Sequence, residues 1–215
     1  MTTVLLAHGS PDPRHSGTLE RLRARVAPVL GAEGRGDTHL CYIEHDGPVP
    51  GELGPRLTGD VTVVPMLLTP AMHARVDVPA AVRALGAGGG AVHLVEALGG
   101  HPLLLDAVDE CLRSHGHDPS APTLLVAGGS SSGQAGESVR TLLERHPRPG
   151  WMAMTLSAPR AGATTGRAVV PATLAEGVLH DKVRVLADRA GAPFVGGGLA
   201  DTEAIAELVL RRARG

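Results

Sequence analysis

The stretch VTVVPMLLTPAMHARVDVP, residues 61–79, decides the fold of this 215-residue chain. It opens with an apolar run rich in β-branched residues, which is typical of a strand buried on both faces of a parallel sheet. Thr69-Pro70 ends that strand, because proline lacks an N–H donor and disfavours helical backbone at the residue before it. His73 follows in a predicted loop, and Asp77 and Pro79 are predicted to cap and begin a helix. In open α/β sheets, a loop at the carboxyl end of a strand is where ligands bind.

Similar strand–helix units surround this stretch in the first half of the chain. Strands are expected at residues 4–7, 39–44 and 91–98 as well as from residue 61, and helices at 19–29, near residue 57, after residue 77, and at 103–112. Four β–α units in succession predict a mostly parallel sheet with right-handed crossovers.

The pattern begins again after the polar, proline-bearing segment 114–122. Further strands are expected at 123–127, 151–156, 167–173 and 192–198, with helices at 138–143, 178–190 and 202–212. Self-similarity on this scale predicts a duplicated α/β fold, with two similar, mostly parallel, four-stranded lobes of flavodoxin-like order and a cleft between them. We expect one lobe at residues 1–118, carrying the functional site described below, and a degenerate repeat at residues 119–215 that closes the cleft.

Composition excludes several classes of function. Hydrophobic content of 43% and charged content of 20% are ordinary for a soluble globular protein. One Trp, one Tyr and one Phe, with a net charge of −2, give no basic aromatic surface for nucleic acid. The N-terminus does not have the pattern of a signal peptide, and no apolar run approaches the roughly 20 residues that span a bilayer. Cys41 and Cys111 are isolated, which favours buried thiols and a reducing, cytoplasmic location.

Three chemically active side chains stand at predicted strand ends in the first half: His8, Glu44 and His73. Each histidine alone could simply satisfy a local loop. Together, at neighbouring strand ends, the three could converge on a metal ion, and imidazole suits iron, cobalt, nickel and zinc alike. The second half has Gly128 and Leu179 opposite the two histidines. We therefore expect one site per chain, in the first half.

Other groups are candidates for binding substrate. Arg14 and Arg75 closely follow the two histidines and are placed to meet an anion. His101, in the Gly-Gly-His-Pro segment, is either part of a plain turn or near substrate.

Ser10 and Ser130 end the matching HGS and GGS segments of the two halves. The GGSSSG stretch at 128–133 lacks the lysine of a P-loop and the G-x-S-x-G context of a serine nucleophile, so neither a nucleotide site nor serine catalysis is favoured.

Taken together, these motifs resemble the sirohydrochlorin chelatase family. The matching segments are LLAHGS ending at Ser10, D-P-R ending at Arg14, Y-I-E ending at Glu44, and P-x-x-H-x-x-x-D-V-P over residues 70–79. The resemblance covers essentially the whole chain and implies the bilobal fold of the class II chelatases. Pro11 and Ala71 depart from the Arg and Gly that the family commonly has at these positions.

The resemblance implies insertion of Fe²⁺ or Co²⁺ into sirohydrochlorin, in siroheme or cobalamin biosynthesis, without ATP or an organic cofactor. His8, Glu44 and His73 match the family's metal-binding and catalytic residues. The divalent ion is then a substrate, and the tetrapyrrole is the partner, bound by the serines, arginines and His101 named above. The alternatives are insertion of another metal such as nickel, use of a different, closely related tetrapyrrole, or a carrier that binds metal or tetrapyrrole without turnover. We expect no nucleic-acid or membrane partner, and a monomer or a homodimer.

Overall fold

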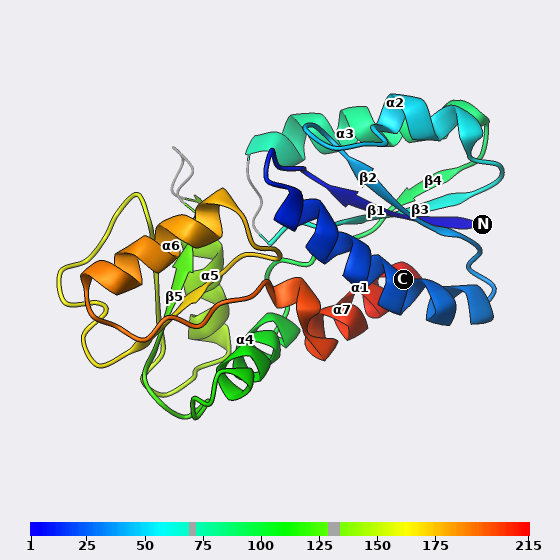
Figure 1. The fold of residues 1–215 in the computed structure, drawn as a ribbon. Helices are drawn as coiled ribbons and strands as arrows, with labels where there is room; N and C mark the ends of the chain where they lie inside the picture. Colours follow the sequence, from blue (N-terminus) through cyan, green and yellow to red (C-terminus); the bar gives the residue numbers. More distant parts are fainter. Residues whose placement is uncertain (69–71, 129–133) are drawn as a thin grey trace. The chain divides into compact units, whose positions relative to one another are not determined.

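The computed structural model describes residues 1–68, 72–128 and 134–215, with the backbone alone for residues 72–75 and 134–135 (Figure 1). It consists of two compact α/β units. Unit 1 contains residues 1–67, 72–98 and 206–215, and unit 2 consists chiefly of residues 99–205. Within the described ranges, no helix is long and apolar enough to cross a membrane.

Unit 1 is built on a four-stranded parallel sheet of order β2-β1-β3-β4. Its strands are β1 (Thr2–Ala7), β2 (Thr38–Tyr42), β3 (Val61–Pro65) and β4 (Val92–Leu94). Leu5 of β1 pairs with Leu40 on one side and with Val64 on the other. This order confirms the predicted flavodoxin-like arrangement, in which the ends of β1, β2 and β3 are neighbours.

Helices cover both faces of this sheet (Figure 1). They are α1 (Pro13–Ala32), α2 (Pro50–Leu53), α3 (Met72–Leu85), the 3-10 turns η1 (Gly54–Arg56) and η2 (Gly86–Gly88), and most of α7 (Glu203–Arg214). The α1 helix buries Leu19, Leu22, Val26 and Leu30, which recur at helical spacing. Val4, Leu6 and Val63 pack instead with Val78 and Leu85 of α3. Alternate side chains of the buried strands therefore face helices on opposite sides.

Unit 2 has a three-stranded parallel sheet of order β6-β5-β7. Its elements are α4 (Leu103–Ser114), β5 (Thr123–Ala127), α5 (Gln134–Arg145), β6 (Met152–Thr155), β7 (Ala168–Pro171), α6 (Val178–Arg189) and η3 (Leu199–Asp201). The expected fourth strand at 192–198 is wrong. Only an isolated bridge joins Phe194 to Val169 there, because Pro193 has no N–H to donate and three glycines follow at 196–198.

Two helix boundaries also differ from expectation. The prediction that His73 lies in a loop was wrong, because α3 already begins at Met72 and contains Asp77 and Pro79 in its interior. The first helix starts at Pro13, with Asp12 as its N-cap, and runs past Gly31 to Ala32. A proline or a glycine is therefore not a reliable boundary here, because tertiary packing holds the helix on both sides of it.

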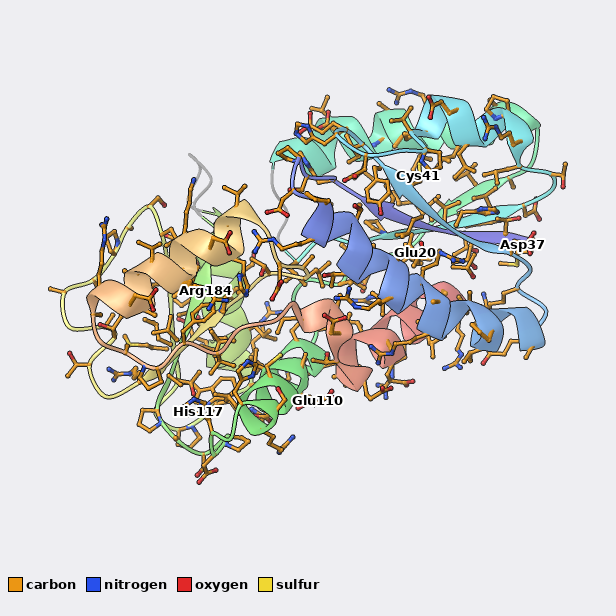
Figure 2. The ribbon with its side chains drawn as sticks, viewed as in Figure 1. Glu20, Asp37, Cys41, Glu110, His117 and Arg184 are labelled. Carbon is orange, nitrogen blue, oxygen red and sulfur yellow. The ribbon has the colours of Figure 1, made fainter. Side chains whose placement is uncertain are left out.

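The last helix of each half of the sequence lies mostly in the other unit. The α4 helix belongs to unit 2, and residues 206–215 belong to unit 1. At the start of α7, Glu110 of α4 accepts backbone N–H groups of Glu203 and Ala204 at 2.7 and 3.0 Å, which satisfies free donors at the positive end of that helix (Figure 2). At its end, Arg214 pairs with Glu33 at 2.5 Å. The functional division at residue 118 stays a prediction.

Both cysteines are free and buried, as their isolation in the sequence predicts. Burial raises the pKa of Cys41 to about 12 and that of Cys111 to about 11. Because the thiolate is the reactive form, neither cysteine is a nucleophile at neutral pH.

Candidate functional site

The backbones after β1 and β2 stay hydrogen-bonded beyond the ends of both strands. Ile43 N–H donates to the Ala7 carbonyl, and Glu44 N–H donates to the His8 carbonyl, both at 2.9 Å. Gly9 follows at φ +96°, and a Cβ at this position would lie 1.7 Å from the carbonyl oxygen of Glu44. Glycine is therefore required both by the positive φ and by the close approach of the second chain. This contact places His8 beside Glu44.

The side chains of His8 and Glu44 meet at this edge of the sheet. His8 Nδ1 lies 3.4 Å from Glu44 Oε1, and the two side chains are 32% and 51% exposed. A neutral imidazole can bind a metal ion or accept a proton, and a carboxylate can do either as well. The pair is therefore accessible, and its predicted role in metal binding and catalysis stays a prediction.

The other predicted ligand, His73, is in the first turn of α3, the helix that follows β3. In the sheet, β3 is the neighbour of β1 on the side opposite β2. The side chains of His73 and Arg75, and the whole of Ser130, lie outside the described residues, so their predicted roles stay predictions. Among the side chains that are described, no group of three or more His, Cys, Asp or Glu residues is arranged to hold a metal ion.

A second histidine, which the sequence reasoning missed, contacts the same carboxylate. His45 Nε2 lies 3.1 Å from Glu44 Oε1. His45 has φ +68°, and Asp46 N–H donates to the Glu44 carbonyl at 2.8 Å. The signal in the sequence was the His-Asp-Gly that directly follows Glu44, a composition typical of a tight turn.

Ser10 links the loop after β1 to this turn. Its backbone N–H donates to Asp46 Oδ2 at 3.2 Å, and its hydroxyl oxygen accepts the Asp12 N–H at 3.2 Å. The hydroxyl keeps its own proton for donation, so its predicted contact with substrate stays a prediction.

The predicted anion-binding Arg14 is engaged with a carboxylate of its own helix. Asp12 caps α1 by accepting the Arg14 backbone N–H at 3.0 Å, and the Arg14 guanidinium binds the same carboxylate at 3.0 Å through Nε and 2.6 Å through Nη2. These bonds lower the pKa of Asp12 to about 2. An anionic substrate that bound Arg14 would share or replace this exposed pair.

His15, in the first turn of α1, is another residue that the sequence reasoning missed. Its Nδ1 is buried and has no hydrogen-bond partner among the described residues. Burial lowers the pKa of His15, with a further lowering by the charge of His8 and an opposing effect from Asp46. His15 therefore belongs electrostatically to the same group of residues and favours its neutral form.

His101 is in unit 2, where it helps to begin a helix. Its Nδ1 accepts the backbone N–H of Leu103 at 3.2 Å, at the first residue of α4. This contact gives His101 a structural role in the turn before α4, and its predicted contact with substrate stays a prediction.

His180 is fully buried in the same unit and packs edge-on against Phe194, with ring centroids 5.2 Å apart.

Comparison with known proteins finds one matching family and several solved structures of similar fold. A sequence profile of the CbiX family matches residues 2–115. SirB from Bacillus subtilis, solved with Fe³⁺, has 16% identity and a TM-score of 0.74 over 99% of this chain and 94% of its own. A CbiX described as the terminal enzyme for biosynthesis of siroheme in denitrifying bacteria has 22% identity and a TM-score of 0.65 over 100% of this chain and 98% of its own.

SirB from Bacillus subtilis subspecies spizizenii, solved with cobalt, has 16% identity and a TM-score of 0.74 over 99% of this chain and 93% of its own. Comparison with curated proteins finds no match. At these identities, the solved structures establish the fold.

We expect Gly9→Ala to destabilise the protein much more than Gly34→Ala does. Both glycines have positive φ, but a Cβ at Gly34 meets nothing within 4 Å, whereas a Cβ at Gly9 meets the Glu44 carbonyl. The strain of positive φ alone costs about 1–3 kcal/mol, and the steric overlap at Gly9 adds roughly 1–3 kcal/mol more. Urea unfolding of both variants measures the difference; equal losses would contradict the close approach.

Arg14→Gln should raise the pKa of Asp12 from about 2 toward 3.8. A carboxylate whose pKa is lowered by folding stabilises the folded state at any pH above its pKa in the unfolded chain. This contribution is lost as the pH falls toward the folded-state pKa of about 2. The stability advantage of wild type over Arg14→Gln should therefore be present at neutral pH and disappear in acid. Carbon-detected NMR titration of the Asp12 carboxyl measures the shift, with Arg25→Gln on the same helix as the control. An unchanged titration midpoint in Arg14→Gln would show that this ion pair does not form in solution.

Proposed function

The chain belongs to the CbiX family, that of the sirohydrochlorin chelatases, and we propose that it inserts a divalent metal ion into sirohydrochlorin or a closely related tetrapyrrole. The observation that carries the proposal is the accessible His8–Glu44 pair at the carboxyl ends of β1 and β2, inside the part of the chain that the family profile matches. Support also comes from the fold shared with two SirB structures, one solved with Fe³⁺ and one with cobalt.

The chemistry of the reaction matches the donor types at the site. A free tetrapyrrole must lose its pyrrole N–H protons while its nitrogens accept the ion. His8, with His73 from α3, would hold the ion at the face of the macrocycle, because neutral imidazole binds first-row transition metals. Glu44, half-exposed and 3.4 Å from His8, would accept pyrrole protons or complete the metal's ligands.

The substrates are then the divalent ion and the tetrapyrrole, with neither an organic cofactor nor ATP. We propose Fe²⁺ or Co²⁺ as the ion, in siroheme or cobalamin biosynthesis. The ring's acidic substituents would be bound by Ser10, Arg14, Arg75, His101 and Ser130. We place the reaction in the cytoplasm, where buried Cys41 and Cys111 would stay reduced.

The test is anaerobic absorption spectroscopy of sirohydrochlorin with Co²⁺ or Fe²⁺. Wild type should give many equivalents of metallated product per chain. His8→Ala, His73→Ala and Glu44→Gln should each lower kcat/KM by about 10²–10⁴-fold, the range for a removed acid–base group. His93→Ala is the matched control, because His93 is an exposed histidine on β4 of the same sheet.

Two results would overturn the assignment. A wild-type rate equal to that of the enzyme-free reaction would exclude this substrate. A stoichiometric complex of metal or tetrapyrrole without turnover would identify a carrier instead.

A further inference from the structure

His45 is the central residue of a strained turn directly beside Glu44. It has φ +68°, and the residue after it, Asp46, donates its N–H to the Glu44 carbonyl at 2.8 Å. A three-residue turn closed by this bond around a central residue of positive φ is rare and strained for a residue other than glycine. Such strain persists only where the surroundings hold it, and it is concentrated at functional sites.

The turn brings the His45 ring back onto the neighbouring carboxylate. His45 Nε2 lies 3.1 Å from Glu44 Oε1, and His8 Nδ1 lies 3.4 Å from the same oxygen. Glu44 is 51% exposed, so its side chain would otherwise exchange between rotamers in solvent. In the structure, both histidines contact the same oxygen of this half-exposed carboxylate.

The turn is itself attached to the loop that carries His8. Ser10 N–H donates to the Asp46 carboxylate at 3.2 Å, and Glu44 N–H donates to the His8 carbonyl at 2.9 Å. The two segments therefore form one framework. The backbone of His45 belongs to this framework, and its ring contacts the Glu44 carboxylate.

We propose that His45 is a positioning residue for Glu44: through Nε2–H it holds the carboxylate beside His8, where the metal ion and the pyrrole protons are exchanged. The inference rests on the proposed function. Partners of this kind orient the groups that bind a metal, and their loss typically costs about 10–100-fold in metal affinity or activity. The competing explanation is that His45 only completes the turn.

Substitution by the two amides separates these explanations. The amide nitrogen of glutamine extends about as far from the backbone as histidine Nε2, whereas that of asparagine corresponds to Nδ1 and does not reach Glu44. Asparagine, however, adopts positive φ more readily than glutamine does. A positioning role therefore requires that His45→Gln recover function and His45→Asn not, and a turn-only role requires the reverse order.

The first measurement is calorimetric titration of each full-length variant with Co²⁺ alone. His45→Ala and His45→Asn should bind Co²⁺ about 10–100-fold more weakly than wild type, and His45→Gln should recover most of that loss. The melting temperature of His45→Asn should be higher than that of His45→Gln, the reverse of their order in Co²⁺ affinity. That result would show that the affinities do not follow stability. His93→Gln and His93→Asn, on exposed β4, are the matched controls and should bind as wild type does.

Turnover of sirohydrochlorin, with KM for the ion and kcat measured separately, is the second readout. If wild type binds Co²⁺ but does not turn over, the proposed function fails, while the Gln–Asn contrast in Co²⁺ affinity still decides the role of His45. Equal Co²⁺ affinity in all His45 variants, affinity that follows thermal stability, or no binding by wild type would each overturn the positioning role.

Discussion

The site depends on two backbone hydrogen bonds that continue the β1–β2 ladder past the ends of both strands. They join Ile43 to Ala7 and Glu44 to His8. The contact is possible only because Gly9 has no Cβ where the Glu44 carbonyl passes. Parallel strands splay apart once their hydrogen bonds end, so any larger residue at position 9 would separate the two segments. The His8–Glu44 pair, and the His45 turn attached to it, follow from this single close approach.

The charged groups around this contact are partly or fully exposed and already have partners. Arg14 is bound to Asp12, and Glu44 contacts both His8 and His45. Exposed ion pairs contribute little net free energy, because water screens them and the side chains lose freedom. Under the proposed function, a metal ion or an acidic substrate would therefore exchange with these partners at low cost. The internal partners meanwhile keep each side chain near the place where it is needed.

The duplicated half shows what the fold does without these groups. Gly128 stands at the position of His8, and a Cβ on Gly128 would lie 2.8 Å from the Leu179 side chain. An apolar side chain thus lies beside Gly128, whereas the polar side chains of His8 and Glu44 meet after β1 and β2. Since both sheets have parallel strands in the same local order, the architecture alone does not create the site. The residues at the strand ends do.

Local pattern in the sequence was enough for the two-half α/β fold and for the pairing of His8 with Glu44. Buried strands such as β5 carry continuous apolar runs, and the ends of neighbouring parallel strands must meet at one edge. The start of α3 depended on tertiary packing, which overrides the boundary that Pro79 suggests. The fourth strand of unit 2 did not form because Pro193 has no backbone N–H to donate, although residues 192–198 otherwise resemble a strand. The position of His45 was decided only by tertiary structure. Its ring meets Glu44 because a turn of positive φ is held against another segment of the chain, and no periodicity encodes that geometry.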